Sequence, residues 1–316
     1  MRKTALVLIA PLALVVAACT GGASPTPSAA PSAAPSAAPS AAPSAAPSAA
    51  PSTSACAGDL PTLTAGTMTV GADNAAYPPY FLHRATGNKP PWEDQPWTGD
   101  PTTGEGFEAA VAYEVAERMG FDAAHLTWVP MQWGQSFAPG DKPFDMHISQ
   151  VSYNPERAQV VDLSDGYFDL NQAVVGNAGA PIDGVSVMSQ LKAYKLGAPA
   201  STTSYQYIVN NIKPTKEPAV YDTLDLALAA LDAKQVDGIV VDLPTAFIAI
   251  AAELSNGTIV GELPTVGEVE HFSIVLPKSS ALTACANEAL ASMKADGTLK
   301  KLTDKWITAG GAPKLS

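Results

Sequence analysis

The sequence predicts an α/β fold in which parallel sheets are covered by helices. From about residue 59 onward, short β-rich runs alternate with amphipathic stretches whose apolar residues recur at helical spacing. A second series of the same alternation follows residues 172–177, and the chain returns to a strand at 270–277 before two closing helices. The roughly 255 residues of this region suffice for one domain or for two lobes.

Each expected element follows from its local pattern. The short β-rich runs at 67–71 (TMTVG), 126–130 (LTWVP) and 144–150 (FDMHISQ) predict strands. Residues 106–120 predict a helix, because their apolar side chains recur at helical spacing and a glycine ends the run. The remaining expected elements are strands at 172–177, 193–199, 237–242 and 270–277, and helices at 201–212, 222–234, about 280–295 and 297–308.

The first 19 residues have the pattern of a secretory leader. They combine a basic start, an apolar run too short for a membrane-spanning helix, and a small-residue finish. The ending VAAC resembles a bacterial lipobox, in which Cys19 is lipidated and becomes the new N-terminus; the alternative is an ordinary leader with a chance cysteine. Because no later segment is long and apolar enough to span a membrane, we expect the lipid on Cys19 alone to hold the chain at the outer face of the cell membrane.

Residues 20–58 contain no charged residue, and residues 28–52 repeat the sequence SAAP. Proline at every fourth position prevents a packed core and favours extended conformations. We expect this segment to be a tether that reaches on the order of 100 Å, at about 3 Å per residue.

Charge and motifs exclude several function classes. The 316 residues carry 18 basic and 30 acidic side chains, a formal net charge of -12, which argues against nucleic acid or an anionic membrane as the main partner. Residues 104–109 (GEGFEA) imitate a dinucleotide-binding loop but do not follow a strand, and residues 189–192 (SQLK) lack the companion motifs of a serine enzyme. The sequence therefore indicates no hydrolase, no nucleotidase, no catalytic residue and no cofactor.

Two cysteines, Cys56 and Cys285, remain after the leader. In an oxidising compartment two leftover cysteines usually form a disulfide, and the alternative is a pair of buried thiols. The four histidines are scattered without ligand-like spacing, so we expect no metal site. His147 lies in a buried-looking strand and is interpreted as a core residue.

Arg157 follows the expected strand at 144–150, at a point where α/β sheets bind ligands. Asn154 and Pro155 suit a helix start, and an arginine beside helix-start amides offers a fork of donors matched to a carboxylate. The alternative is a surface arginine that pairs with Glu156 or Asp162.

Other candidate residues also follow strands. The hydroxyl run at 201–204 (STTS) leads into a helix, where it either caps the helix or adds to an anion site. Asp242 either caps the next helix or accepts a ligand ammonium. Tyr77 and Trp133 are loop aromatics that either pack in the core or grip a side chain. Together these groups match the two charges and the side chain of an α-amino acid.

With these groups in this order the sequence resembles a known family, the extracytoplasmic amino-acid-binding proteins of ABC importers (solute-binding family 3, type II periplasmic-binding fold). The resemblance spans roughly residues 66 to 308 and rests on the order of the motifs TVGADNAAYPPY, GEGFEAAVAYEVAERMGF, FDMHISQVSYNPERAQVVDLSDGYF, LGAPASTTS, VDGIVVDLPTA and ADGTLKKLTDKW. It implies two α/β lobes joined by two hinge strands, with the ligand enclosed in the cleft between them.

The resemblance also implies roles for particular residues. Arg157 would clamp the ligand α-carboxylate with help from Ser152, Thr202 and Thr203, and Asp242 would receive the α-ammonium. Tyr77 and Trp133 would flank the side chain. Asn74, Gln150 and Ser204 complete the expected ligand-binding set.

The sequence departs from the family pattern at several points. Asn154 stands where Thr or Ser is common, and Ser201 stands where Gly is usual. Asp73 lies one residue further from the tyrosine than the usual acid, which puts Asn74 in that place. Residues 83–105 are longer than the family's usual hairpin, and we expect them to extend over the cleft mouth. These departures affect the identity of the ligand more than its class.

The sequence therefore predicts a lipid-anchored, monomeric binding protein that captures a free amino acid and delivers it to an ABC permease. The expected boundaries are a signal peptide at 1–19, a tether at 20–58, a discontinuous first lobe at 59–171 and 266–316, and a second lobe at 172–265. Two alternatives remain: a sensory module that presents its ligand to a receptor, and a cyclohexadienyl (prephenate or arogenate) dehydratase-like enzyme. The enzyme would need an acid/base carboxylate at the substrate, for which Glu108, Glu268 and Glu270 are the candidates.

Overall fold

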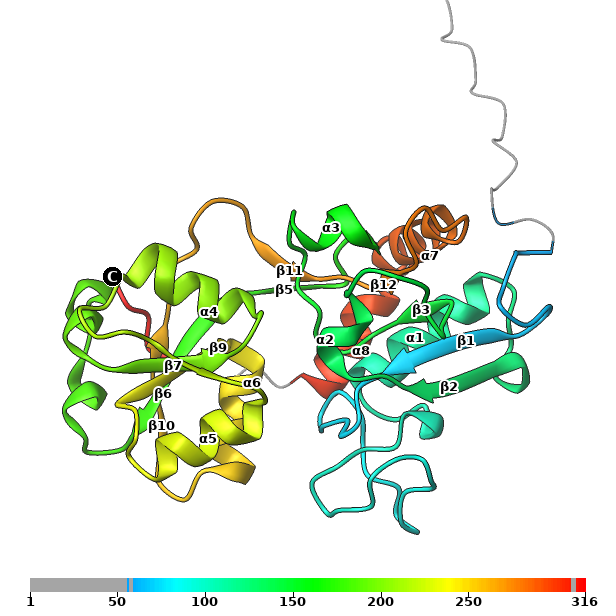
Figure 1. Cartoon of the computed structure of the whole chain (residues 1–316). Helices are drawn as coiled ribbons and strands as arrows, with labels where there is room; N and C mark the ends of the chain where they lie inside the picture. Colours follow the sequence, from blue (N-terminus) through cyan, green and yellow to red (C-terminus); the bar gives the residue numbers. More distant parts are fainter. Residues whose placement is uncertain (1–55, 57–58, 308–310) are drawn as a thin grey trace, which may run out of the picture. The chain divides into compact units, whose positions relative to one another are not determined.

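The first lobe is built on a mixed five-stranded sheet. The computed structural model describes Cys56, residues 59–307 and residues 311–316, and the sheet has the strand order β2-β1-β3-β12-β4 (Figure 1). The strands are β1 (Met68–Ala72), β2 (Leu126–Pro130), β3 (Met146–His147), β4 (Asp162–Leu163) and β12 (Val275–Leu276). β1 pairs in parallel with β2 and β3, whereas β12 is antiparallel to β3 and β4.

The second lobe contains another mixed sheet, with the order β10-β6-β9-β7-β8. Its strands are β6 (Gln172–Asn177), β7 (Leu196–Pro199), β8 (Ala219–Tyr221), β9 (Gly238–Asp242) and β10 (Gly257–Glu262). β7 is parallel to β8 and β9, and β6 is antiparallel to β9 and β10. The expectation of parallel sheets is therefore only partly correct, because hydrophobic periodicity shows that a strand exists but not its direction.

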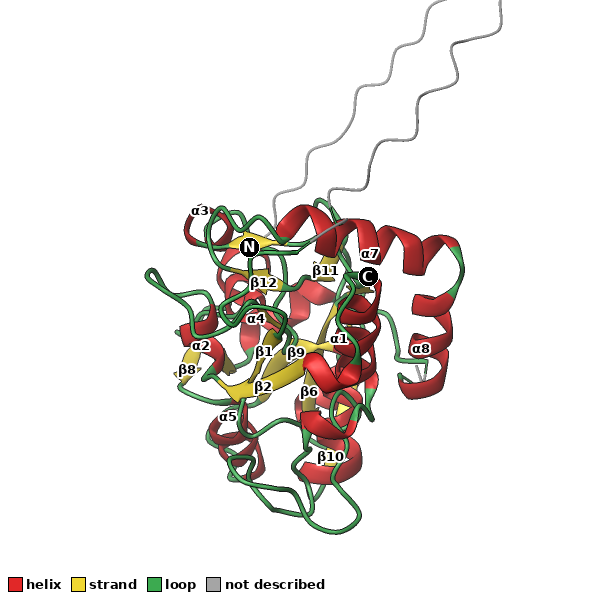
Figure 2. Cartoon of the chain, turned by 90° about the vertical axis from the view of Figure 1, so that its right-hand side faces the viewer, coloured by secondary structure: helices red, strands yellow, loops and turns green. Residues whose placement is uncertain are grey.

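Helices cover both sheets. The α-helices are α1 (Phe107–Arg118), α2 (Trp133–Ser136), α3 (Arg157–Val160), α4 (Thr203–Tyr207), α5 (Leu224–Asp232), α6 (Leu243–Ile248), α7 (Thr283–Ala295) and α8 (Thr298–Trp306). α4 and α6 continue as π-helical segments at Ile208–Ile212 and Ala249–Glu253, and 3-10 turns lie at Pro101–Thr103, Ala123–His125, Pro181–Gly184 and Met188–Ala193. In the first lobe α1 packs against α7 and α8 (Figure 2).

Two antiparallel strands, β5 (Phe168–Leu170) and β11 (Glu270–Phe272), connect the lobes (Figure 1). β5 leads directly into β6 of the second lobe, and β11 returns the chain to β12 of the first lobe. Each lobe has its own apolar core, since the buried side chains of the first sheet and those of the second form separate clusters. The two-lobe fold predicted from the sequence is confirmed.

The C-terminal segment belongs to the second lobe, which corrects the expected boundary. The prediction places residues 266–316 in the first lobe, yet residues 311–316 lie along β10. The backbone N–H of Glu262 donates to Pro313 O at 2.6 Å, and the N–H of Leu315 donates to Glu262 O at 2.9 Å. Leu315 is buried in the second lobe's core, and Gly261 makes room for it, because a Cβ there would lie 2.7 Å from Leu315 Cδ2.

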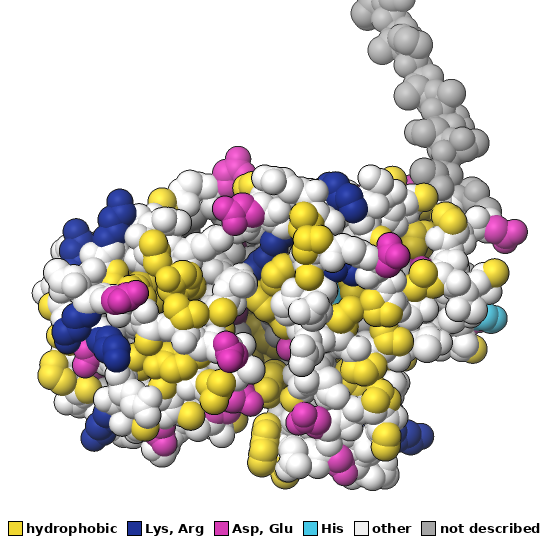
Figure 3. Space-filling model, viewed as in Figure 1, with side chains coloured by type: hydrophobic (Ala, Val, Ile, Leu, Met, Phe, Trp, Pro, Cys, Tyr) yellow, Lys and Arg dark blue, Asp and Glu magenta, His cyan; other side chains and the backbone are white. Residues whose placement is uncertain are grey.

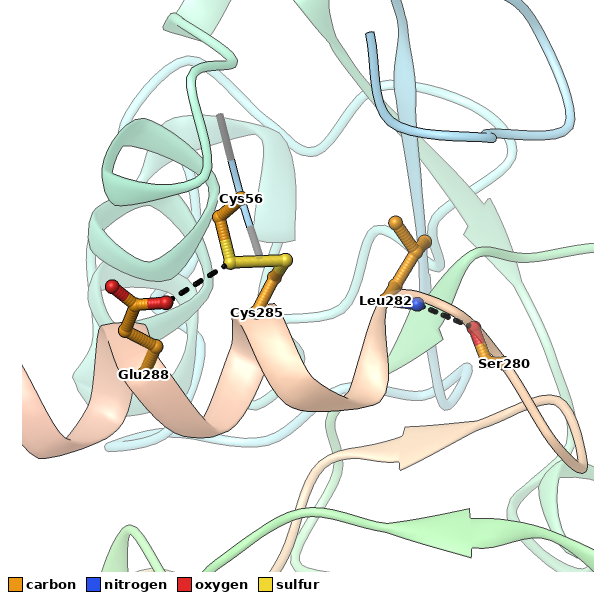
Figure 4. The surroundings of a disulfide bond; sticks show 5 residues. All are labelled: Cys56, Ser280, Leu282, Cys285 and Glu288. Atoms are coloured by element: carbon orange, nitrogen blue, oxygen red, sulfur yellow. Dashed lines mark hydrogen bonds between the residues drawn. A yellow bond between two sulfur atoms is a disulfide. The ribbon is translucent and has the colours of Figure 1, made fainter. Parts of the chain in front are cut away.

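A disulfide bond joins Cys56 to Cys285 on α7, the pairing that the sequence favours (Figure 4). The Glu288 carboxylate lies one helical turn further along α7, 3.4 Å from Cys56 Sγ. The bond fixes the start of the folded region to the first lobe. The predicted leader, the lipidation site at Cys19 and all of the predicted tether except Cys56 lie outside the described residues.

Candidate functional site

A cavity of about 640 Å³ lies between the two lobes. Figure 3 shows the surface hollowed between them. All ten residues that the sequence suggests for ligand binding contribute to its lining: Asn74, Tyr77, Trp133, Gln150, Ser152, Arg157, Thr202, Thr203, Ser204 and Asp242. The fold therefore gathers these residues from both lobes at the carboxyl ends of the strands, where α/β sheets bind ligands.

Arg157 is a buried cation between the lobes. The residue begins the short helix α3, and it is only 6% exposed. The guanidinium carbon lies 5.0 Å from the ring centre of Trp133 and 4.3 Å from that of Phe137. Nη1 donates to Ser152 O and Nη2 donates to Ser201 O, each at 2.7 Å. Among the described residues no carboxylate lies within salt-bridge distance, and burial lowers the Arg157 pKa to about 10.

The surface ion pair that the sequence left open for Arg157 is therefore absent from the described structure. Asn154 holds this turn as expected, since its Oδ1 accepts from the Glu156 N–H at 2.7 Å. The guanidinium donates to neutral carbonyls and lies over two aromatic rings, and only the more distant charge of Glu270 offsets part of the cost of its burial. It is suited to a carboxylate that arrives with a ligand.

The hydroxyl groups at the start of α4 already donate to protein atoms. Thr202 caps the helix by accepting from Tyr205 N at 3.1 Å and donates to Pro199 O at 2.8 Å. Thr203 donates to Glu270 at 2.5 Å, and Ser204 donates to Gln172 at 2.7 Å. What this run can offer an anion is therefore mainly the unpaired backbone N–H groups of the helix start.

Ser201, which precedes this cap, has a φ of 61°. This left-handed conformation favours glycine, so a serine is held here at a conformational cost. The conformation places the Ser201 carbonyl where Arg157 donates to it.

Asp242 takes the capping role that the sequence left open, and its position also allows the second role, which stays a prediction. It caps α6 by accepting from Thr245 N at 3.0 Å through Oδ1, and its carboxylate also lines the cavity. Burial raises its pKa from 3.8 to about 6, and the nearby charge of Glu270 adds to this rise. A cation that reached the carboxylate would stabilise the ionised form, so Asp242 is suited to an ammonium group.

Tyr77 and Trp133 line the cavity from the first lobe. The Tyr77 hydroxyl donates to the carboxylate of Asp225, at 3.0 and 3.2 Å to its two oxygens, which connects the lobes. Trp133 Nε1 donates to Ser149 O at 3.0 Å, which fixes the indole plane beside the Arg157 guanidinium. Both aromatic side chains thus present apolar surface to the cavity while their polar atoms are satisfied.

The Asn74 and Gln150 side chains hold neighbouring segments in place. Asn74 Nδ2 donates to Pro91 O at 2.9 Å, and its Oδ1 accepts from Glu93 N at 3.1 Å. Gln150, at a φ of 45°, donates through both its backbone N–H and its side-chain amide to Glu108. Burial raises the pKa of Glu108, which lies behind the cavity wall, to about 7.

Sequence reasoning missed the acidic character of this cavity. Besides Asp242, four carboxylate side chains line it, from Asp73, Glu93, Asp222 and Asp225. Glu93 belongs to the 83–105 segment. The sequence made this segment notable by its length, but no side chain in it was predicted to bind the ligand. The sequence did hold one signal of this acidic character, because Asp73 lies one residue from the position of the usual family acid. No local pattern pointed to Asp225 as a lining residue.

Neither a metal site nor a membrane span appears in the described part of the chain. No group of three or more His, Cys, Asp or Glu side chains is arranged to hold a metal ion there. None of its helices has the length and hydropathy of a membrane span. His147 lies in the first lobe's interior, where burial lowers its pKa to about 3.

Comparisons with known proteins agree with this geometry. A model of the bacterial extracellular solute-binding proteins, family 3, matches residues 82–309. The L-cystine-binding protein TcyJ of Escherichia coli (strain K12) is 28% identical over 252 residues, which cover 77% of this chain and 84% of that protein. The ABC transporter arginine-binding protein 1 of the same organism is 27% identical over 173 residues, covering 52% of this chain and 67% of that protein.

A solved structure has the same architecture. An ancestral arginine-binding protein bound to arginine superposes with a TM-score of 0.58 and is 27% identical to this chain. The match covers 77% of this chain and 99% of the solved one.

Proposed function

The chain belongs to family 3 of the bacterial extracellular solute-binding proteins, which are amino-acid-binding proteins of ABC importers, and on that premise we propose that it captures an amino acid between its two lobes and delivers it to a membrane permease. In this proposal Arg157 binds the ligand α-carboxylate and Asp242 binds the α-ammonium. Tyr77 and Trp133 flank the side chain.

One observation carries the proposal: the buried guanidinium of Arg157 lines a cavity without a carboxylate partner among the described residues. Burying a cation costs several kcal/mol unless an opposite charge meets it. A ligand carboxylate in the cavity would supply that charge. The carboxylate of Asp242, on the same lining, would meet the ligand's ammonium, so both ligand charges would be compensated when water is excluded.

Hinge closure explains how the ligand is retained. Within the described residues, side-chain hydrogen bonds cross the cleft from Tyr77 to Asp225, from Arg157 to Ser201 O, and from Asn154 to Gln206 at 2.9 Å. They depend on the lobes being close together, and β5 and β11 are the elements that would bend. In the proposed cycle the ligand binds one lobe of an open form, and closure then adds the contacts of the other lobe.

The main test is a binding measurement with an arginine variant. A thermal-shift screen of the twenty amino acids identifies the ligand, because a tight ligand raises the apparent stability by mass action. We expect Arg157→Ala to weaken calorimetric affinity for that ligand by at least ~100-fold, since breaking a buried charge pair costs about 3–5 kcal/mol.

Arg118→Ala is the matched control. Arg118 forms ion pairs with the partly exposed side chains of Glu114 and Asp296, and it does not line the cavity. Near wild-type affinity in the Arg157 variant would overturn the assignment of the clamp. A screen in which no amino acid raises the stability would overturn the function itself.

We further propose that the chain is anchored through lipidated Cys19 and acts as a monomer at the outer face of the cell membrane. The lipobox-like ending and the charge-free tether support this anchoring. A Cys19→Ser variant should be released from the membrane fraction, and a variant that stays bound would contradict the anchor. Uptake of the labelled ligand by cells with and without the chain separates an importer component from a sensory module.

The enzymatic alternative receives less support from the site. Glu108 and Glu270 do not line the cavity, and both side chains accept hydrogen bonds from neighbouring protein groups. Glu268 also lies outside the lining. A turnover assay with prephenate and arogenate tests this directly, and sustained product formation would favour the enzyme over the transport protein.

A further inference from the structure

We propose that the ligand carries a cationic side chain, and that Asp73 together with Glu93 of the 83–105 segment recognises that cation. This inference rests on the proposed function, because it concerns the side-chain end of the same amino-acid site. It names a substrate class, the basic amino acids, and two residues that determine the specificity.

The charges that line the cavity are strongly unequal. Arg157 is the one cation among the described lining residues, against the carboxylates of Asp73, Glu93, Asp222, Asp225 and Asp242. Arg157 and Asp242 account for the two charges of the amino-acid backbone. Four carboxylates then remain for the side chain, and no basic side chain of the described structure forms an ion pair with any of them.

Asp73 has one oxygen free for a ligand. It follows β1 and is half-buried beside Trp133. Its Oδ1 accepts from the backbone N–H groups of Asn74, at 2.9 Å, and Trp133, at 3.2 Å. Oδ2 has no hydrogen-bond partner within the described chain, although the side chain lines the cavity. The two backbone bonds fix the carboxylate, so its second oxygen is preoriented for a cation that passes along the Trp133 ring.

The 83–105 segment is held so that Glu93 lies near Asp73. Asn74 bonds both Pro91 O and Glu93 N, as described above, and Asn88 Nδ2 donates to Glu93 O at 2.7 Å. Trp92, the neighbouring residue, is 4% exposed and packs in the core of the first lobe. These contacts place the Glu93 side chain on the cavity lining at its exposed end.

Like charges converge at this end of the cavity from both lobes. Asp225, in the first turn of α5, accepts from the Tyr77 hydroxyl. Burial raises the pKa of Asp73 most, and the nearby charges of Asp225 and Glu93 raise it further, so each of these two carboxylates lies close enough to Asp73 to repel it. A ligand cation among them would relieve that repulsion. The guanidinium of Arg157, which is 6% exposed in the same cavity and forms no ion pair within the described residues, independently suits the cavity to a ligand with a carboxylate.

The test compares ligands of equal shape and different charge. L-arginine and L-citrulline are nearly isosteric, but the guanidinium of arginine is cationic and the urea of citrulline is neutral. We expect isothermal titration calorimetry to give at least tenfold tighter binding of L-arginine or L-lysine than of L-citrulline or L-glutamine. Asp73→Asn keeps the acceptor for the two backbone N–H groups and should cost about 10–100-fold for the cationic ligand, but less than threefold for the neutral one.

Glu93→Gln should cost about two- to fivefold for the cationic ligand, because an exposed carboxylate interacts weakly. Glu105→Gln removes the same charge from the same segment at an exposed position outside the lining, and should leave affinity unchanged. Tighter binding of a neutral amino acid, or an equal loss in the Glu105 variant, would overturn the inference while the proposed function stands. A protein that binds none of the amino acids would instead overturn the function.

Discussion

Ligand affinity should depend steeply on pH between 8 and 5, more steeply for a basic amino acid than for a neutral one. The perturbation acts on two cavity carboxylates. Burial raises the pKa of Asp242 and that of Asp73 from 3.8 to about 6 in each case. The neighbouring charges act in the same direction, from Glu270 on Asp242 and from Asp225 and Glu93 on Asp73.

The sign follows from which protonation state binds. A ligand cation interacts favourably with a carboxylate and not with a neutral carboxyl group, so binding requires both groups to be ionised. At pH 8 both are ionised, and at pH 5 each is about nine-tenths protonated if its pKa is about 6. The dissociation constant of a neutral amino acid, which uses Asp242 alone, should therefore rise about tenfold from pH 8 to pH 5. That of a basic amino acid, which uses both groups, should rise about 100-fold.

The assay is calorimetric titration at pH 8, 7, 6 and 5, repeated in two buffers with different ionisation enthalpies to count the protons taken up. The Asp73→Asn variant serves as the control, because it should reduce the dependence for a basic ligand to that of a single group. Affinity that stays constant over this range, or that becomes tighter as the pH falls, would refute the reasoning for both carboxylates.

Further variants test single contacts. Tyr77→Phe removes the hydroxyl that donates to Asp225 across the cleft. It should weaken ligand binding about three- to tenfold, mainly through faster ligand release measured by stopped flow. An unchanged release rate would show that this hydrogen bond does not hold the lobes together. Changing Cys56 and Cys285 to Ser should lower the free energy of unfolding by about 2–4 kcal/mol in urea titrations, and stability equal to wild type would contradict the expected effect of the cross-link. Leu315→Ala should cost about 2 kcal/mol, because it empties a buried position of the second lobe, whereas the exposed Lys314→Ala should cost little.

The sequence predicted those parts of the site that depend on local chain patterns. Arg157 follows a strand and a helix-start signal, and Asp242 ends a strand and precedes a proline, so both were recognisable from neighbouring residues. The amphipathic helix expected at 106–120 is present as α1, and the strand expected at 126–130 is β2. These features are encoded by residues only a few positions apart.

The parts that escaped prediction depend on contacts between distant residues. Asp73 and Asp225 are 152 positions apart and come together only when the lobes approach, which no local pattern records. The hydroxyl of Thr203 appeared free for a ligand but donates to Glu270, which the hinge strand β11 brings to it. Residues 311–316 have no periodic pattern, and their place on the second lobe follows from the space left by Gly261.

The ends of the folded region lie in different lobes. Cys56 is bonded to α7 of the first lobe, whereas Ser316 is hydrogen-bonded to Ser186 in the second lobe (Figures 1 and 4). A donor fluorophore attached at Asp59, the first described residue after Cys56, and an acceptor attached at Ser316 would therefore move with opposite lobes. Energy transfer between them would report hinge motion directly, with neither label placed in the cavity, so the fold is suited to conversion into a fluorescent sensor of its own ligand.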